Sequence, residues 1–197
     1  MSWPRDPTHA ELVTTARRWL GHRMRCPVIV SEMGAGSEIP DVLGWHPGRI
    51  APWHLYARTV MVECKVAVGD LRADRHKSVR RIPELGVGQV RFLMAPAGLA
   101  EAGAYNGWVP EGWGLLIVKP HRQERWGWSV YPDLQRCPEV RTEWDWRSEG
   151  LMLLSLVRRL GAAAIDGQVP VSVRAYDFEP AKGVTLAIKR EPSGLGD

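Results

Sequence analysis

The stretch Val60-Met-Val-Glu-Cys-Lys-Val-Ala-Val68 decides the fold that we predict for this chain. In an extended strand, successive side chains point to opposite faces of the sheet, so the stretch separates into two sets. One face is apolar and carries Val60, Val62, Cys64, Val66 and Val68. The other face carries Met61, Glu63, Lys65 and Ala67. We therefore expect a strand that buries its first face in a core and holds a carboxylate beside an ammonium on its second face.

A second carboxylate precedes this strand. Asp41 follows Pro40 within segment 38–45, whose residues predict another strand. Pairing of the two strands would bring Asp41 close to Glu63 and Lys65 at one end of a sheet. Two carboxylates and a lysine in that arrangement can hold a divalent metal ion and orient a water molecule on a phosphodiester. The simpler interpretation is an exposed Glu–Lys pair on one strand face and an aspartate in a turn.

The composition excludes several classes of protein. A chain of 197 residues, with 45% hydrophobic and 24% charged residues, is long enough for one globular domain with a sizeable core. No apolar run approaches the ~20 residues that span a membrane, and the N-terminus lacks the pattern of a secretion signal. The cysteines Cys26, Cys64 and Cys137 form no CxxC pair, which argues against a disulfide framework or a zinc ribbon. We expect a cytoplasmic protein without a membrane partner.

The charge distribution is compatible with a polyanionic partner. The formal net charge is +4, and a basic chain can attract nucleic acid. Basic residues gather in one segment and are Arg72, Arg75, Lys77, Arg80 and Arg81. These side chains either contact phosphates of a nucleic acid or form a solvated basic face of a helix.

The order of predicted elements indicates the fold class. Thr8-His-Ala-Glu11 is a capping box that begins a helix ending at Gly21. The predicted strands cover residues 27–32, 38–45, 60–68, 89–95, 113–118 and 126–131, and the last two form a hairpin. A basic helix is expected over residues 70–81. The order helix, three strands, helix, strand predicts an α/β fold with a mixed central sheet flanked by helices.

A final helix closes the predicted main domain. Ser148 is the expected N-cap, and an apolar stripe at helical spacing follows before Gly161. That stripe consists of Leu151, Leu154, Val157 and Leu160. We therefore divide the chain into a domain over residues 1–161 and a C-terminal extension over residues 162–197. The extension contains two short segments, 169–174 and 184–189, that predict a hairpin of edge strands before a frayed tail.

Pro40-Asp41 followed by Glu63-Cys-Lys65 resembles the signature of the PD-(D/E)XK nuclease superfamily. Residues 63–74 are similar to the E-x-K-x-S-x-x-D-F-x-A-D stretch of its MmcB-like branch and of phage-associated relatives, with Ala67 where relatives often carry serine. Residues 38–45 are similar to their EIPD-x-x-G-W segment. Residues 91–96 and 110–115 resemble their R-F-Y-x-x-P strand and the following P-x-G-W-G-L. The resemblance covers roughly residues 28–118.

The resemblance implies a restriction-endonuclease-like αβββαβ core and a Mg²⁺- or Mn²⁺-dependent deoxyribonuclease of repair, recombination or phage DNA processing. Asp41 and Glu63 would be the metal ligands, with the backbone carbonyl of Cys64 as the third. Lys65 would orient the attacking water or balance charge on the phosphate. DNA is the implied partner, and many relatives form homodimers that cut both strands. A binding module without activity and an RNA-directed nuclease are the alternatives.

Several further residues are candidates for accessory roles in this site. Glu32, at the end of the first predicted strand, is a tentative additional metal ligand, whereas the capping box already explains Glu11. Glu38 points to the opposite strand face from Asp41 and is expected either to support the site residues from behind or to fix a loop. Asp70 and Asp74 lie four residues apart on one helix face, where Asp70 either caps the helix or joins Asp74 in a second metal or water network. Gln89 is a weak candidate for contacting the nucleophile.

Overall fold

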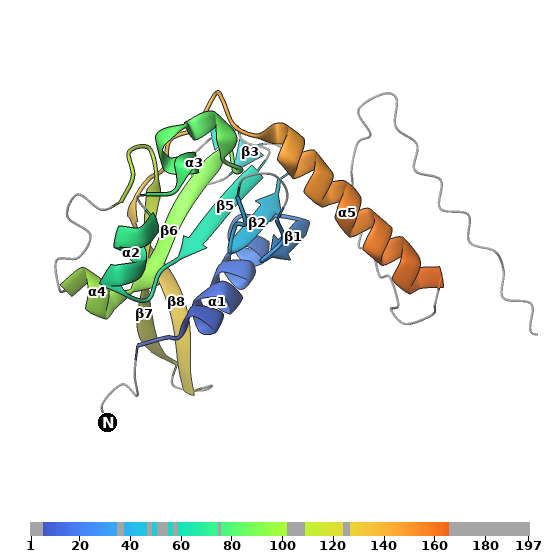
Figure 1. Ribbon diagram of the computed structural model, residues 1–197. Helices are drawn as coiled ribbons and strands as arrows, with labels where there is room; N and C mark the ends of the chain where they lie inside the picture. The colour runs from blue at the N-terminus through green and yellow to red at the C-terminus, as the bar shows by residue number, and fades with distance from the viewer. Residues whose placement is uncertain are drawn as a thin grey trace, which may run out of the picture.

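A six-stranded mixed sheet forms the centre of the computed structural model, which describes residues 6–34, 38–46, 49–50, 55–56, 59–74, 76–101, 109–123 and 127–165. Its strands, in spatial order, are β1 (Val28–Ser31), β2 (Val42–Trp45), β5 (Thr59–Cys64), β6 (Val90–Pro96), β7 (Gly114–Gln123) and β8 (Gly127–Arg136) (Figure 1). Two short strands, β3 (Arg49–Ile50) and β4 (Leu55–Tyr56), pair with each other outside this sheet.

The pairing directions confirm the α/β class and the mixed sheet predicted from the sequence. Antiparallel pairs join β1 to β2, β2 to β5 and β7 to β8, whereas β6 runs parallel to both β5 and β7. The predicted order of helix, three strands, helix and strand is present in the large sheet and its helices, with the β3–β4 pair inserted before β5. The predicted hairpin is also present and is formed by the longer strands β7 and β8.

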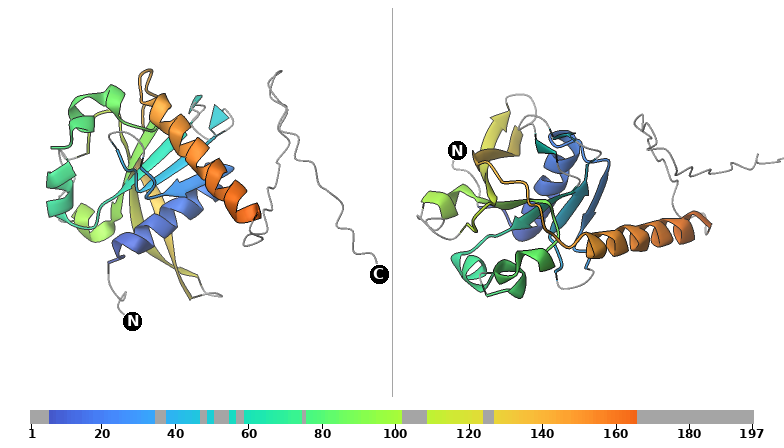
Figure 2. Two further views of the ribbon diagram at one scale, coloured as in Figure 1. Left: turned by 45° about the vertical axis from the view of Figure 1, so that its right-hand side comes forward. Right: turned by 90° about the horizontal axis from the view of Figure 1, so that it is seen from above.

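Helices cover both faces of the sheet. Helix α1 (His9–His22) packs against one face, where Leu12, Leu20, Val62 and Phe92 belong to one buried core. The other face packs against α2 (Val68–Asp74), α4 (Ala97–Glu101) and the beginning of α5 (Trp146–Ile165). Figure 2 shows the sheet between these two layers and α5 extending away from it. Within the described residues, no helix is long and apolar enough to cross a membrane.

The capping box at the start of α1 is confirmed. The Glu11 N–H donates to Thr8 Oγ1, and the Thr8 N–H donates to Glu11 Oε2 at 2.7 Å. These reciprocal bonds satisfy amides that have no partner inside the helix. They fix the first turn of α1, which begins at His9.

Strand β5 shows the predicted alternation of faces but is shorter than predicted. Val62 and Cys64 lie in the core under α1, and Met61 lies in the opposite core, so both faces of β5 are buried. The strand ends at Cys64 rather than Val68. The Lys65 N–H still donates to the Met94 carbonyl, but the next donor along β6 would be Pro96, which has no N–H. The chain therefore leaves the sheet and begins α2 at Val68.

The predicted helix over residues 70–81 is divided in two. Helix α2 ends at Asp74 and α3 (Ser78–Arg81) begins after Lys77, before the short 3-10 helix η1 (Pro83–Leu85). Since α2 begins two residues before Asp70, the expected N-cap role of Asp70 is wrong, and Asp70 lies in the first turn. The break after Asp74 directs Lys77 toward the end of β5, as described below.

The beginning of α5 differs from the prediction. Asp145, not Ser148, caps the helix, because the Ser148 N–H and hydroxyl both donate to the Asp145 carboxylate. The helix continues past Gly161 to Ile165, while the predicted edge strands 169–174 and 184–189 lie outside the described residues. Three residues of the predicted apolar stripe are exposed: Leu154 is 61% exposed, and Leu151 and Val157 are each 58% exposed. Met152 and, partly, Leu156 instead face the core.

Gly44 provides a test of the packing between β2 and the α1 side of the core. A Cβ atom at Gly44 would lie 2.9 Å from the Cys26 sulfur and 3.3 Å from a Leu20 methyl group. We expect Gly44→Ala to lower the free energy of unfolding by about 1–3 kcal/mol, measured by urea denaturation. Gly150→Ala is the control, because nothing lies within 4 Å of its new methyl group and alanine favours helix by up to about 1 kcal/mol. Equal stability of the two variants would contradict the packing described here.

Candidate functional site

The register of β2 and β5 brings two carboxylates together at one end of the sheet. The β2–β5 ladder ends at the pair Val42 and Val62, and an extension of this antiparallel register by one position, just outside β2, places Asp41 opposite Glu63. Directly opposite side chains lie about 5 Å apart at their Cβ atoms, and like charges there repel. Burial raises the pKa of Asp41, and the negative charge of Glu63 raises it further. The predicted convergence of Asp41 and Glu63 is therefore present.

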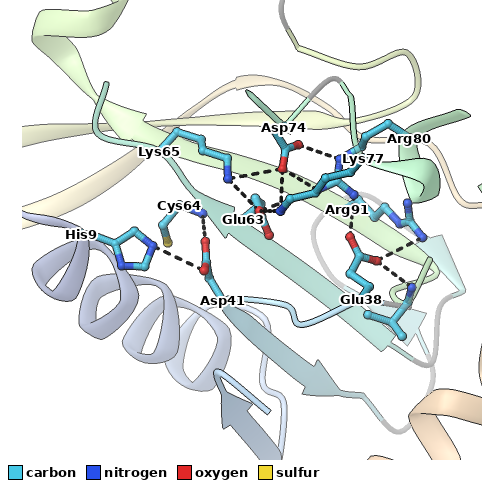
Figure 3. Close-up of polar contacts among 11 residues, drawn as sticks. His9, Glu38, Asp41, Glu63, Cys64, Lys65, Asp74, Lys77, Arg80 and Arg91 are labelled. Carbon is cyan, nitrogen blue, oxygen red and sulfur yellow. Dashed lines mark hydrogen bonds and ion pairs between the residues drawn. The ribbon is translucent and has the colours of Figure 1, made fainter. Parts of the chain in front are cut away.

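Asp41 also connects three elements through its two oxygens. Its Oδ2 accepts a hydrogen bond of 2.6 Å from the Cys64 N–H, and its Oδ1 lies 3.4 Å from Nε2 of His9 on α1 (Figure 3). Both contacts partly offset the rise in the Asp41 pKa. Sequence reasoning missed His9, although the capping box located the helix start, because nothing in the sequence indicates which strand end lies beside that turn.

The backbone around Cys64 explains a role for Pro40. The Cys64 N–H points toward β2, and in an antiparallel strand the carbonyl of the same residue points to the same neighbour. The register places Pro40 opposite Cys64, and proline has no N–H to donate. The sheet therefore cannot use the Cys64 carbonyl on that side. The Cys64 side chain, as expected, is buried in the core under α1, and burial raises the pKa of its thiol.

Glu63 has one oxygen surrounded by cations and one without a partner. Its Oε1 lies 2.7 Å from Nζ of Lys65, 3.1 Å from Nζ of Lys77 and 3.7 Å from Arg80. Its Oε2 is buried and has no hydrogen-bond partner within the part of the chain that the structure describes. The side chain is only 2% exposed. A buried carboxylate oxygen with an unused lone pair is costly, so a further donor or cation at Oε2 would stabilise Glu63.

Asp74 is the third carboxylate of this cluster and shares its cations. Arg80 contacts both of its oxygens, and Lys77 and Lys65 lie 2.8 and 3.4 Å from Oδ1. Burial alone would raise the pKa of Asp74, but these cations outweigh burial and hold the pKa below its usual range. Burial would lower the pKa of Lys65, but Glu63 and Asp74 raise it, so Lys65 is an ammonium at neutral pH.

Arg80 does not lie on a solvated face, contrary to the sequence-based expectation of a basic helix surface. Its side chain is 4% exposed and bridges Asp74 to Glu38, which lies 2.5 Å from Nη1. The guanidinium also stacks 4.5 Å from the centre of the Trp113 ring. Glu38 accepts a hydrogen bond from the Val87 N–H and so fixes the loop before β6, as expected. One partner of Arg80, Glu38, lies 42 positions away in the sequence, and the local basic pattern does not reveal it.

A cavity of about 350 Å³ opens over this end of β5. Its lining consists of His9, Cys64, Lys65, Val66, Asp70, Ala73, Asp74 and Lys77. Asp70 and Asp74 do share the helix face that borders it, as the four-residue spacing predicted. The cavity therefore gives a ligand access to Lys65 and Lys77 above the buried carboxylates.

Two predicted accessory residues do not line the cavity, although the Glu32 N–H donates to the Asp41 carbonyl at 3.1 Å. Glu32 is exposed and adopts a left-handed φ of 51° just after β1, and it does not line the cavity. Gln89 precedes β6, and its N–H donates to Thr59 Oγ1 at the start of β5. Because four residues separate Thr59 from Glu63, Gln89 lies about 13 Å from the site along the sheet. Glu32 as a metal ligand therefore stays a prediction, whereas the distance along the sheet argues against Gln89 as a contact to the nucleophile.

The remaining basic residues fall into two groups. Arg72 is exposed on α2, and Lys77 lines the cavity. Arg75 and the side chain of Arg81 lie outside the described residues. Contact with phosphates therefore stays a prediction for Lys77 and Arg72 among the described residues, whereas Arg80 is buried and paired with Glu38 and Asp74.

The geometry does not by itself identify a relative. Comparison of the chain with protein-family models, curated proteins and solved structures gives no match in any of the three. The PD-(D/E)XK resemblance consequently remains a prediction from the sequence motifs.

The donor set fits a divalent metal ion. Among the described residues, no three side chains of histidine, cysteine, aspartate or glutamate form a metal-binding group on their own. Asp41 and Glu63 would supply two carboxylates, and the Cys64 carbonyl would supply the third oxygen that a hard cation prefers. A cation shared by the two carboxylates would give the buried Oε2 of Glu63 a partner and would offset the burial and the Glu63 charge that raise the pKa of Asp41.

Replacement of Asp41 by asparagine tests this site without an assay of activity. The raised pKa means that the ionised Asp41 destabilises the fold above its unfolded pKa of 3.8. Without metal at pH 7, we expect Asp41→Asn to raise the free energy of unfolding by up to about 1 kcal/mol. Mn²⁺ should stabilise the wild type but not the variant, as measured by urea denaturation in EDTA and in Mn²⁺. Equal stabilisation by Mn²⁺ would contradict the assignment of Asp41.

Asp74 should produce an acid-sensitive part of the stability. Its lowered pKa contributes stability that is present above the unfolded pKa of 3.8 and is lost as pH falls below it. We expect Asp74→Asn to cost about 3–5 kcal/mol at pH 7, because buried cations lose a partner. It should also remove up to about 1.4 kcal/mol per pH unit from the acid slope of stability below 3.8. Asp133→Asn, in an exposed pair with Lys119, is the control and should change stability little.

Proposed function

We propose that this protein is a metal-dependent nuclease that hydrolyses phosphodiester bonds of DNA. The observation that carries the proposal is the cross-strand pair of Asp41 and Glu63, with Lys65 Nζ 2.7 Å from Glu63 at the edge of an open cavity. A protein gains no stability from a half-buried carboxylate beside a buried one, whose Oε2 has no hydrogen-bond partner among the described residues. Such an arrangement is typical of a site kept for chemistry.

The fold supports the finer assignment to a restriction-endonuclease-like core. The order α1, β1, β2, β5, α2, β6 follows the αβββαβ order that the PD-(D/E)XK resemblance implies. The two halves of the motif meet at the β2–β5 pair, and β6 continues the sheet in parallel beside β5. A chance occurrence of Pro-Asp and Glu-x-Lys in an unrelated sequence would not require the two halves to be neighbours in space.

Each residue of the motif has a distinct chemical task in this proposal. A bound Mg²⁺ or Mn²⁺ would acidify a water molecule and stabilise charge on the phosphate oxygens. Asp41, Glu63 and the Cys64 carbonyl would hold the ion. Lys65 stays protonated because Glu63 and Asp74 raise its pKa, so it acts as a hydrogen-bond donor and positive charge beside the phosphate rather than as a base.

Several features of the site favour a nucleic-acid substrate. The cavity is lined by Lys65 and Lys77, and Arg72 is exposed on the neighbouring helix α2. A cavity of about 350 Å³ accommodates a phosphate and an adjoining group but not a folded partner. The net charge of +4 also favours association with a polyanion.

The decisive experiment is a cleavage assay with purified protein and Mg²⁺ or Mn²⁺. Single-stranded, duplex, nicked and branched DNA and single-stranded RNA should be compared as substrates. We expect metal-dependent products from DNA that EDTA abolishes. Asp41→Asn and Lys65→Met should each reduce the rate at least about 100-fold, because the first loses a ligand of the metal ion and the second loses a positive charge beside the phosphate. Lys119→Met, a change at an exposed ion pair on β7, is the matched control and should cut at the wild-type rate.

The outcomes separate this proposal from its alternatives. Wild-type protein that binds DNA but yields no products with either metal would contradict the nuclease and favour a binding module. Products from RNA alone would exclude the DNA substrate while keeping the chemistry. Full activity of Asp41→Asn would exclude the site described here.

A further inference from the structure

Two lysines, not one, contact the buried carboxylate of Glu63. Lys65 Nζ lies 2.7 Å and Lys77 Nζ 3.1 Å from the same oxygen, Oε1. Both ammonium groups also approach Asp74 Oδ1, at 3.4 and 2.8 Å respectively (Figure 3). The sequence motif includes Lys65 but does not explain a second lysine at this position.

The two lysines differ in accessibility. The side chain of Lys65 is 11% exposed and extends from the end of β5, whereas that of Lys77 is 45% exposed. Lys77 lies at the N-cap position of α3, in the break between α2 and α3, and lines the cavity. Lys77 can therefore change its conformation toward the cavity without disturbing a buried side chain.

Lys77 is also redundant as a counter-ion for the buried carboxylates. Glu63 retains Lys65 if Lys77 moves, and Asp74 retains Arg80, which donates to its two oxygens at 2.6 and 3.1 Å. Removing Arg80 would instead deprive both Asp74 and Glu38 of a cation. After Lys77 departs, Glu63 and Asp74 each keep another cation, so the cost of its departure is low.

The two most buried carboxylates of the cluster have cationic partners before any metal binds. Glu63 and Asp74 are both approached by Lys65, Lys77 and Arg80. A divalent ion on Glu63 adds two positive charges close to the Lys77 ammonium. Like charges at such separations repel, and Lys77 is the exposed, replaceable member of the set.

We propose that Lys77 is the resting counter-ion of Glu63, that metal binding displaces it, and that the displaced ammonium then binds a phosphate of the substrate. This inference rests on the proposed metal site and adds to it a coupling between metal and substrate. Before metal binds, Lys77 is held by Glu63 and Asp74. After metal binds, Lys77 becomes a phosphate ligand at the mouth of the cavity, beside Lys65.

The test measures binding rather than cleavage. Mn²⁺ affinity should be measured by calorimetry for the wild type, Lys77→Met and Lys77→Arg. We expect Lys77→Met to bind Mn²⁺ roughly tenfold more tightly, because a competing charge-assisted contact to Glu63 is lost. Lys77→Arg keeps the charge and should stay close to the wild type. Lys119→Met removes a lysine of similar exposure, paired with Asp133 on the sheet, and should not change Mn²⁺ affinity.

A second measurement tests the transfer of Lys77 to phosphate. Thymidine 5′-monophosphate, which contains no phosphodiester to cut, serves as the probe with and without Mn²⁺. We expect Lys77→Met to bind this probe several-fold more weakly than the wild type when Mn²⁺ is present and equally when it is absent. An equal loss in both conditions would show a simple phosphate contact and would overturn the displacement.

The outcomes distinguish failure of this inference from failure of the proposed function. A wild type that binds no Mn²⁺ excludes the metal site and this inference together. A wild type that binds Mn²⁺, with Lys77→Met and Lys119→Met alike in Mn²⁺ affinity, excludes only the role of Lys77. Circular dichroism of both variants confirms that they are folded, as expected because every carboxylate near Lys77 retains another cation.

Discussion

The antiparallel register between β2 and β5 forces Asp41 and Glu63 together, and the arrangement of the site follows from that constraint. A shift of one residue would turn one of these carboxylates to the opposite face, where the core under α1 is apolar. The hydrophobic residues of both strands hold the register, since Val42 and Val62 are fully buried. Core packing thus holds two like charges close together. The free energy gained from hydrophobic burial outweighs the repulsion between the two carboxylates.

A layer of cations makes this repulsion tolerable. Arg80 is central to it, because it contacts Asp74 and Glu38 while stacking on Trp113. Through Glu38 the same network reaches the Val87 amide and so fixes the loop that leads into β6. The site therefore has a rigid, buried part that belongs to the stability of the fold. It also has an accessible part, at Lys77 and the cavity, where a ligand can be accommodated.

Sequence reasoning succeeded where a local pattern carries the information. Alternation along residues 60–64 predicted which side chains of β5 share a face, and the capping box predicted the start of α1. It failed where a residue meets a partner far along the chain. Arg80 lies in a basic segment of the sequence, and only the fold shows that it is buried and forms ion pairs with Glu38 and Asp74. His9 and Asp41 likewise meet only because α1 packs beside that strand end. At α5, the side chains of Asp145 and Ser148 can both cap a helix, and the sequence does not show which of them does so.

Pro40 affects the end of β5 because proline has no backbone N–H. By register it lies opposite Cys64, where any other residue would bring an amide hydrogen to the carbonyl of that strand. Pro96 acts similarly on the β6 side, where the ladder to β5 stops after Lys65. Two prolines thus withhold amide hydrogens from the end of one strand, at the Cys64 carbonyl on the β2 side and at the Lys65 carbonyl on the β6 side. Such a contribution belongs to the backbone, and replacing either proline by alanine would supply the missing donor without removing a charged group.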